Sequence, residues 1–414
     1  LREHEVGFIL RATAARLHVV PGSFRGTDYA DLARRGGWDG PILTIRGDHP
    51  LPRGEAAPPQ DPHPDAAAVI LWTSGTTSEP KGVVHTHRSL QTEAVTIAAA
   101  HALGSGDPLL LPMPVTHVAG FTYGALLPAV TGVVGVLMDV WDPGRALDLV
   151  ARERIAAIIS TPVFLRTMLD HPDFATCDHS SLRLFSLGGA GVAPAMVREG
   201  AAVLGCRCKR TYGSTEYPTL STGGPDDDLE RDAVTDGRLI SAGEVRIVEP
   251  GTDTDRAPGE AGELLVRGPE MFSGYLDSAL DAAAFAEGGW FRTGDLAIFD
   301  GTHLVIVDRL KDIIIRGGEN ISALEVESAL VTHPAVVEAA CVAFPDPVMG
   351  EKVCAFVIPA PGPAPTLDDL RAHVLATGLA RFKAPERLEV RADLPRTASG
   401  KVRKAPLRAE LRDR

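Results

Sequence analysis

Residues 73–82 read Thr73-Ser74-Gly75-Thr76-Thr77-Ser78-Glu79-Pro80-Lys81-Gly82 and directly follow an apolar run that ends at Trp72. Five of the first six side chains carry a hydroxyl group, and Lys81 adds a positive charge. Hydroxyl groups, backbone N–H groups near glycine and an ammonium group all bind phosphate oxygens. Pro80 excludes a Walker A loop, which has glycine immediately before its lysine. The stretch therefore predicts a polyphosphate-binding loop that follows a strand.

Short apolar runs and longer helical patterns alternate around this loop. They predict strands at 69–72, 108–111, 155–160 and 184–187 and a helix at 163–169. Such alternation is typical of a largely parallel sheet covered by helices. Beyond Gly237 the pattern changes to strands separated by Gly and Pro turns, as at 243–248 and 262–267, which predicts a β-rich subdomain.

The charged run Asp308-Arg309-Leu310-Lys311-Asp312 separates two apolar runs and predicts a hinge. Downstream, Ser322 with Glu325 and Thr366 with Asp369 have the spacing of capping boxes, and apolar runs predict strands at 336–343 and 353–358. We therefore expect an α/β protein with three parts: an N-terminal domain at 1–307 whose residues 235–307 are β-rich, a hinge at 308–312 and a small α+β C-terminal domain at 313–414.

Composition narrows the class of protein. The chain has 414 residues and a formal net charge of −13, which repels nucleic acid and anionic lipid surfaces. Its longest apolar stretch, 124–138, is shorter than the roughly 20 residues of a membrane-spanning helix and predicts a buried helix running into a strand. Five cysteines without paired spacing suit a reducing cytoplasm, and Cys206 with Cys208 lacks a second pair to complete a metal site.

The chain begins at Leu1, and a helical pattern that includes Val6, Ile9 and Leu10 is under way in its first turns. We therefore expect that an upstream segment is missing. The Pro-rich run 50–64 predicts an exposed connector.

The string at 73–82 resembles the signature loop of the adenylate-forming superfamily, which includes acyl- and aryl-CoA synthetases, peptide-synthetase adenylation domains and firefly-type luciferases. Further strings resemble the family's motifs in the family's order: Gly188-Gly189-Ala190-Gly191, Tyr212-Gly213-Ser214-Thr215-Glu216, Phe291-Arg292-Thr293-Gly294-Asp295, Gly317-Gly318-Glu319-Asn320 and Pro395-Arg396-Thr397-Ala398-Ser399-Gly400-Lys401. Each string alone is a weak signal. Six in collinear order are hard to obtain by chance.

The resemblance implies roles for these residues. The ATP phosphates would be bound by Thr73, Ser74, Gly75, Thr76, Thr77 and Lys81. Thr215 would contact the α-phosphate, and Glu216 with Thr76 would hold Mg²⁺. The adenine would lie between Gly189-Ala190-Gly191 and the segment of Tyr212, Gly213 and Ser214. The ribose would be bound by Asp295 and Arg309.

The same resemblance implies a mobile C-terminal domain. Lys401 would catalyse adenylation, and Lys311 would be the pivot about which the domain rotates. Gly317 and Gly318 would then border the tunnel for the thiol. His117 resembles a histidine that lies near the bound carboxylate in acyl- and aryl-CoA ligases.

The resemblance implies an ATP- and Mg²⁺-dependent acyl-CoA synthetase that forms an acyl-AMP and then an acyl-CoA thioester, with coenzyme A as co-substrate. Amino-acid-activating relatives carry an Asp where this chain has none, between Pro112 and Tyr123. This favours a medium-chain or cyclic or aromatic carboxylic acid, with Phe121, Tyr123 and Gly124 lining its pocket. A cytoplasmic enzyme of fatty acid metabolism is consistent with this substrate class. The sequence leaves open whether the protein forms a homodimer.

Two other functions remain open from the sequence. A stand-alone adenylation domain that loads a carrier protein would share every nucleotide motif. An inactive, truncated nucleotide-binding paralogue would explain why the hydroxyl-rich loop lies as early as Thr73, and its sheet would have an uncovered edge. The retained Lys401 argues against it.

Overall fold

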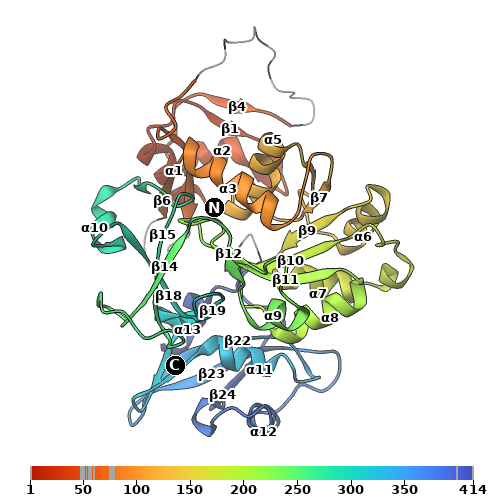
Figure 1. The fold of residues 1–414 in the computed structure, drawn as a ribbon, viewed down its shortest axis with the longest axis vertical. Coiled ribbons are helices and arrows are strands. Elements are labelled where there is room, and N and C mark those ends of the chain that lie inside the picture. The colour runs from red at the N-terminus through yellow and green to blue at the C-terminus, as the bar shows by residue number, and fades with distance from the viewer. Residues whose placement is uncertain are drawn as a thin grey trace.

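The computed structural model describes residues 2–46, 61–73, 80–397 and 400–412, together with residues 52, 54 and 58. The elements after residue 310 gather at one end of the molecule, in blue in Figure 1, and the elements before it form the rest. We call residues 2–309 the body and residues 313–412 the tail.

The largest sheet of the body has seven strands in the order β13-β12-β11-β10-β9-β7-β8. They are β7 (Pro108–Leu111), β8 (Val134–Leu137), β9 (Ala157–Ser160), β10 (Leu184–Gly188), β11 (Arg207–Tyr212), β12 (Ser221–Thr222) and β13 (Arg238–Leu239). Neighbours from β8 to β11 are parallel, and β12 and β13 join antiparallel. The predicted parallel sheet is therefore confirmed, although β9 begins two residues later than expected.

Helices cover both faces of this sheet. On one face, α6 (Pro143–Arg152), α7 (Pro162–Leu169) and α8 (Pro194–Leu204) bury apolar side chains against β9 and β10. On the other face, α3 (His87–Ala100) and α5 (Leu127–Thr131) do the same. The stretch 124–138 runs from a helical segment into β8, as expected, although the helical residues are mostly half-buried or exposed rather than buried. None of the helices among the described residues is long and apolar enough to cross a membrane.

The strand predicted at 69–72 exists but lies outside the parallel sheet. It is β5 (Ala67–Thr73), which pairs antiparallel with β6 (Lys81–Thr86); β6 also pairs with β16 (Gly274–Tyr275). A parallel partner needs a crossover of about a dozen residues or more. The connection from Thr73 to Lys81 is shorter than that, so it permits only the antiparallel pairing.

The predicted β-rich subdomain is a five-stranded antiparallel sheet. Its strands are β14 (Glu244–Val248), β15 (Gly262–Arg267), β17 (Phe285–Ala286), β18 (Trp290–Phe299) and β19 (Leu304–Arg309). The register of β18 on β19 pairs Asp295 with Arg309. This pairing brings together two residues singled out from the sequence.

The tail has its own core, as predicted for an α+β domain. It contains β20 (Ile314–Arg316), β21 (Glu319–Ile321), α11 (Ala323–Leu330), β22 (Val336–Asp346), β23 (Gly350–Pro359), α12 (Leu367–Ala376), β24 (Arg387–Val390) and α13 (Lys404–Arg412). Buried side chains of α11 and α12 pack against the sheet, and α13 contributes to a second cluster. A single turn of 3₁₀-helix, Leu310–Asp312, follows β19 and links body to tail.

Helix caps in the tail agree with the sequence in one case and differ in the other. Thr366 and Asp369 form the expected capping box at the start of α12. Ser322 accepts a hydrogen bond from the Glu325 N–H at 3.1 Å. The Glu325 carboxylate, however, accepts from Lys383 Nζ at 2.5 Å, because a nearby ammonium group is a stronger donor than the backbone.

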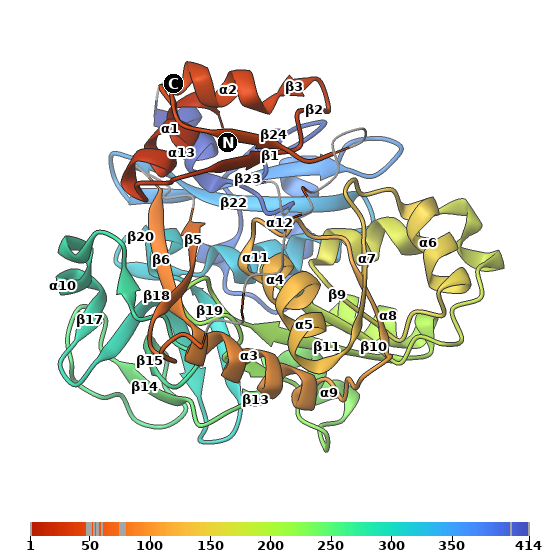
Figure 2. The ribbon, with the colours of Figure 1, turned by 90° about the horizontal axis from the view of Figure 1, so that it is seen from above.

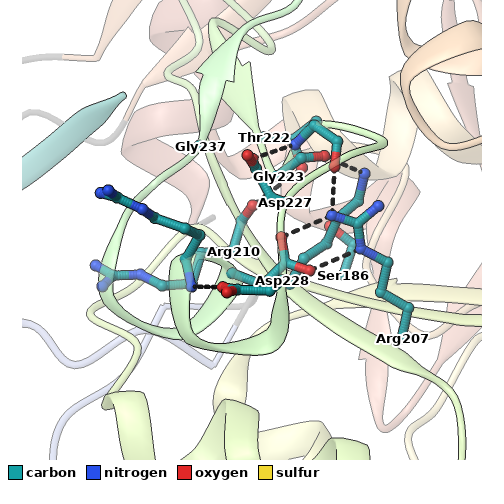
Figure 3. A network of polar contacts seen from close by, with 12 residues as sticks. Ser186, Arg207, Arg210, Thr222, Gly223, Asp227, Asp228 and Gly237 are labelled. Atoms are coloured by element: carbon teal, nitrogen blue, oxygen red, sulfur yellow. Dashed lines mark hydrogen bonds and ion pairs between the residues drawn. The ribbon is translucent and has the colours of Figure 1, made fainter. Parts of the chain in front are cut away.

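A buried polar network ties β11 to the segments that follow it (Figure 3). Arg207 donates to both carboxylate oxygens of Asp232, and Arg210 pairs with Asp236. Thr222 Oγ1 donates to the carbonyl of Arg210 at 2.9 Å. Because buried charges are stable only when paired, this network fixes the strand whose last residue is Tyr212.

Candidate active site

The candidate site lies at the carboxyl ends of the parallel strands. The segment after β7 leads to His117, that after β9 to Thr161, that after β10 to Gly189, and that after β11 to Thr215. In open α/β sheets, ligands bind in the crevice at this edge. Figure 2 shows β9, β10 and β11 side by side, so the segments that follow these strands come to one edge of one sheet.

Tyr212, Asp295 and Arg309 form one contiguous group. Tyr212 Oη donates to Asp295 Oδ2 at 2.6 Å, and Arg309 Nε lies 3.2 Å from Asp295 Oδ1. Asp295 is buried. Burial and the neighbouring Asp295 carboxylate raise the pKa of the Tyr212 phenol well above its usual value, so this phenol remains a donor. Tyr212 and Arg309 therefore hold the Asp295 carboxylate in a fixed orientation.

Lys401 reaches this group from the tail. Its backbone N–H donates to Thr397 Oγ1 at 3.1 Å, and Gly400, at φ +82°, lies against Val163 at the start of α7. Burial lowers the pKa of Lys401 to about 8, with a further lowering by the Arg309 charge and an opposing effect of Asp295. The Lys401 ammonium group therefore lies within electrostatic range of the residues predicted to bind the ribose.

His117 is a second body residue within electrostatic range of Lys401. It is the N-cap of α4 (Val118–Phe121), and its Nδ1 accepts from the Ala119 N–H at 3.3 Å. Burial lowers the pKa of His117, and the charge of Lys401 lowers it further. A neutral imidazole is therefore placed near the ammonium group.

Glu216, Tyr275 and Lys81 form a second group. Tyr275 Oη donates to Glu216 Oε1 at 2.8 Å, and Lys81 Nζ lies 5.2 Å from the centre of the Tyr275 ring. In addition, His85 Nε2 is 2.8 Å from the Thr215 carbonyl oxygen, which ties β6 to the motif after β11. The ends of β5 and β6 thus lie next to the Tyr212–Glu216 segment.

The Glu216 carboxylate fits a magnesium ion that is bound jointly by the protein and by phosphate groups. Mg²⁺ is commonly held by one or two carboxylates together with phosphate oxygens and waters. Glu216 supplies one carboxylate, and the described residues contain no cluster of three His, Cys, Asp or Glu that could hold a metal without help. Thr76, the other predicted ligand, lies outside the described residues, as do Ser74, Gly75 and Thr77.

Three further predicted site residues lie in the link and the tail. Gly317 and Gly318, at φ +58° and +92°, form the turn between β20 and β21. The N–H of Gly317 donates to the carbonyl of Met349 at 2.8 Å, which is also a tail residue. Lys311 lies in the 3₁₀ turn of the link, and burial lowers its pKa.

The expected acyl pocket needs a correction. Tyr123 is only 3% exposed, and its hydroxyl lies 3.3 Å from His101 Nε2 and 3.4 Å from Thr219 Oγ1. It belongs to the core rather than to a pocket wall. Gly124 does pack closely on Leu111 at the end of β7. Tyr123 belongs to a π-helical segment, Thr122–Leu126, and packs in the core cluster together with residues of α3, β7 and β9.

Three contributions were not anticipated from the sequence. Tyr275 orients Glu216, Thr161 lies against Gly189, and the Arg396–Glu338 ion pair fixes the segment that carries Lys401. Arg396 lies within the quoted motif, which was a usable signal. Tyr275 and Glu338 have no local signal because their roles depend on the pairing of distant strands.

This chain is similar to known proteins over most of its length. The AMP-binding enzyme family matches residues 1–276, and the AMP-binding enzyme C-terminal domain matches residues 325–401. The chain is 36% identical over 352 residues to the medium-chain fatty-acid–CoA ligase of Escherichia coli, covering 84% of this chain and 62% of that protein. It is also 36% identical over 363 residues to the indoleacetate–CoA ligase of Aromatoleum aromaticum, covering 86% and 70%.

A solved structure agrees over the whole chain. ATP-bound MatB from Rhodopseudomonas palustris superposes with a TM-score of 0.89 at 28% identity, covering 100% of this chain and 82% of that chain. The chain thus spans 62% of the length of the first relative and most of this structure. The matches to both halves and the shared fold lead to one conclusion: the chain belongs to the AMP-binding enzyme family, in the acyl- and aryl-CoA synthetase branch of the adenylate-forming superfamily.

Proposed function

We propose that this protein is a carboxylate–CoA ligase that uses ATP to make an acyl-AMP and then transfers the acyl group to coenzyme A. The observation that carries the proposal is the position of Lys401. Lys401 belongs to the tail, yet its charge acts on the body: Arg309 and Asp295 shift the pKa of Lys401, and Lys401 in turn lowers the pKa of His117. Such a placement suits a reaction in which negative charge moves between a carboxylate and a phosphate.

In the first step, a carboxylate oxygen of the acid attacks the α-phosphorus of ATP, and the bond to pyrophosphate breaks. This makes a mixed anhydride and releases pyrophosphate, so protein groups mainly position the reactants and neutralise charge. Lys401 would donate hydrogen bonds to the α-phosphate and the leaving oxygen. Asp295 would accept from the ribose hydroxyls, and Thr215 would contact the α-phosphate.

Glu216, with Thr76, would hold Mg²⁺, which neutralises phosphate charge when it is bound. The Tyr275 hydroxyl keeps one Glu216 oxygen in place. Lys81 would bind the outer phosphates from the end of β6. His117 would orient the substrate carboxylate through its Nε2, since its Nδ1 is already occupied by the Ala119 N–H.

In the second step, a thiol sulfur attacks the acyl carbonyl, AMP leaves, and the thiol proton passes to solvent or to the phosphate. The product is a thioester. We propose that the tail turns about Lys311 between the steps, which withdraws Lys401 and brings Gly317 and Gly318 to the site. The separate core of the tail and its single short link to the body are compatible with such a movement.

We propose that the substrate is a medium-chain, cyclic or aromatic carboxylate whose acyl chain or ring carries no charge. No Asp occurs in the segment 112–123 to pair with a substrate ammonium group. Two similar proteins are named for a medium-chain fatty acid and for indoleacetate. A cytoplasmic enzyme of fatty or aromatic acid metabolism would fit this substrate class.

The test measures the two steps separately. ATP–pyrophosphate exchange across fatty, alicyclic and aromatic acids reports acyl-AMP formation, and CoA-dependent AMP release with the best acid reports transfer. We expect exchange with at least one acid and release with free CoA. Exchange without release to CoA, but with release to a carrier protein, would favour the carrier-loading alternative. No exchange with any acid would support the inactive paralogue.

Lys401→Ala is the decisive variant. Loss of a preorganised charge-stabilising donor typically costs about 3–4 kcal/mol of transition-state stabilisation, so exchange should fall by at least about a hundredfold. Thioester formation from supplied acyl-AMP should persist. The matched control is Arg403→Ala, because Arg403 is a nearby basic residue that is exposed.

A further inference from the structure

Asp308 lies at the end of the body and is bonded to the first helix of the tail. Its Oδ2 accepts from Ser322 Oγ at 2.9 Å and from the Leu324 N–H at 3.0 Å. Its Oδ1 accepts from the Arg309 N–H at 2.7 Å. Asp308 is only 4% exposed, and Ser322 is 6% exposed. The buried Asp308 carboxylate and Ser322, the N-cap residue of α11, therefore both cap the first turn of this helix.

These bonds cross the link between the two parts. Asp308 belongs to β19, whereas Ser322 and Leu324 follow the 3₁₀ turn Leu310–Asp312 and two tail strands. A carboxylate at a helix N-terminus is favoured by the unpaired N–H groups and by the helix dipole. The first turn of α11 therefore receives part of its cap from the body.

A hollow of about 470 Å³ lies at this boundary and is lined by Val192 and Val305 from the body and by Ser322 and Leu324 from the tail. Leu324 also packs against Gly191. The hydrogen bonds of Asp308 add directional contacts to this apolar packing, so they help to set the orientation of α11.

A rigid chain of contacts connects α11 to Lys401. Buried side chains of α11 pack on β22 in the tail core. Glu338 of β22 pairs with Arg396 at 2.9 Å, and Arg396 Nη1 also donates to the Gly400 carbonyl at 3.2 Å. Turning α11 away from Asp308 would therefore move the segment that carries Lys401.

We propose that Asp308 is a positioning residue that holds the tail in the orientation that places Lys401 beside Asp295 and His117. The cap is made only in this orientation, because Ser322 and Leu324 leave Asp308 when the tail turns about the link. Asp308 thus favours the first step of the proposed reaction over the second. The effect on catalysis rests on the function proposed above, while the orientation itself is a property of the structure alone.

The test compares Asp308→Ala with Asp308→Asn and with Thr366→Ala. An Asn carbonyl oxygen in the place of Oδ2 still accepts both tail hydrogen bonds, without the negative charge and without the bond from the Arg309 N–H. Thr366 is the matched control, since it caps α12 of the same tail through Asp369 and belongs to no contact across the link described above. Thermal midpoints of all three variants report how far each change weakens folding.

Catalysis gives the first readout. We expect Asp308→Ala to lower kcat of ATP–pyrophosphate exchange by at least about tenfold, the factor that loss of one hydrogen bond to a charged group corresponds to. Transfer from supplied acyl-AMP to CoA should stay within about twofold or rise. Asp308→Asn should recover part of the exchange, and Thr366→Ala should keep both steps near the wild-type values. Equal losses in both steps, or an equal loss in Thr366→Ala, would overturn the inference.

Shielding of Lys401 gives a readout that needs no activity. The amine is modified with acetic anhydride, and the extent at Lys401 is measured by mass spectrometry. We expect modification to rise several-fold in Asp308→Ala and to be unchanged in Thr366→Ala. Unchanged modification in Asp308→Ala would refute the positioning role even if exchange were lost. Raised modification in a protein whose wild type shows no exchange would refute the proposed function but not the positioning role.

Discussion

Tyr212 Oη donates a 2.6 Å hydrogen bond to Asp295 Oδ2, although 83 positions separate the two residues. Arg309 pairs with the second oxygen of the same carboxylate. Strands β11, β18 and β19 each supply one member, so two sheets of the body are joined at this point. The predicted nucleotide contacts are therefore oriented before a nucleotide arrives.

Tyr212→Phe should weaken ATP binding more than it slows chemistry. The ring that is expected to cover the adenine remains, but its orientation is no longer fixed by Asp295. Loss of one hydrogen bond to a charged group is worth about 1.5 kcal/mol, so KM for ATP should rise roughly tenfold while kcat changes little. Steady-state exchange at varied ATP checks this. A fall in kcat at unchanged KM would contradict the binding role.

The protonation of Lys401 should limit the first step at high pH. Burial lowers the pKa of this amine to about 8, so the free enzyme loses the catalytic charge as the pH rises through that value. We expect kcat/KM for ATP to fall about tenfold per pH unit above this point. Lys401→Arg should flatten this limb, because a guanidinium group stays protonated. An alkaline limb that is unchanged in Lys401→Arg would assign it to another group.

Tyr275→Phe should alter the response to magnesium. The variant removes the hydroxyl that binds Glu216 Oε1 at 2.8 Å, while its ring can still face Lys81. With the carboxylate less well oriented, the Mg²⁺ concentration for half-maximal exchange should rise several-fold. Exchange assays at fixed ATP and varied Mg²⁺ measure this. Phe285→Leu, in the same aromatic cluster, is the control for altered packing.

Glu93 should make folding stability depend on pH. It is fully buried on α3, and its Oε1 accepts from Thr219 Oγ1 at 2.7 Å. Burial raises its pKa from 4.5 to about 8, with a further contribution from Glu270. Between these values the unfolded chain loses this proton and the folded chain keeps it. The contribution of Glu93 to stability therefore decreases as the pH rises through this window.

Glu93→Gln removes this titration and keeps an acceptor for Thr219. We expect the variant to gain roughly 2–4 kcal/mol on the wild type between pH 5 and pH 8, at about 1.4 kcal/mol per unit of pKa shift. Urea unfolding at the two pH values measures the change. Glu287→Gln, at an exposed glutamate, should show no such gain. An equal gain in both variants would mean that net charge, not burial, is responsible.

The sequence by itself determined the class of fold and the chemistry of the site residues. Apolar runs predicted β7 and β15 to the residue and the parallel sheet as a whole, because local hydrophobic patterns follow strand and helix periods. Three motifs could also be identified from the sequence, because phosphate and ribose contacts require particular residue types in short runs. They contain Tyr212, Asp295 and Lys401.

Only the tertiary structure decided which of these residues meet. It placed β5 in a separate antiparallel sheet, buried Tyr123 in the core, and brought Tyr275 to Glu216. It also joined Asp308 to the start of α11 across the link. These outcomes depend on strand register and on the packing of segments far apart in the chain. Such contacts leave no local pattern, because their free energy arises only when distant surfaces are in place.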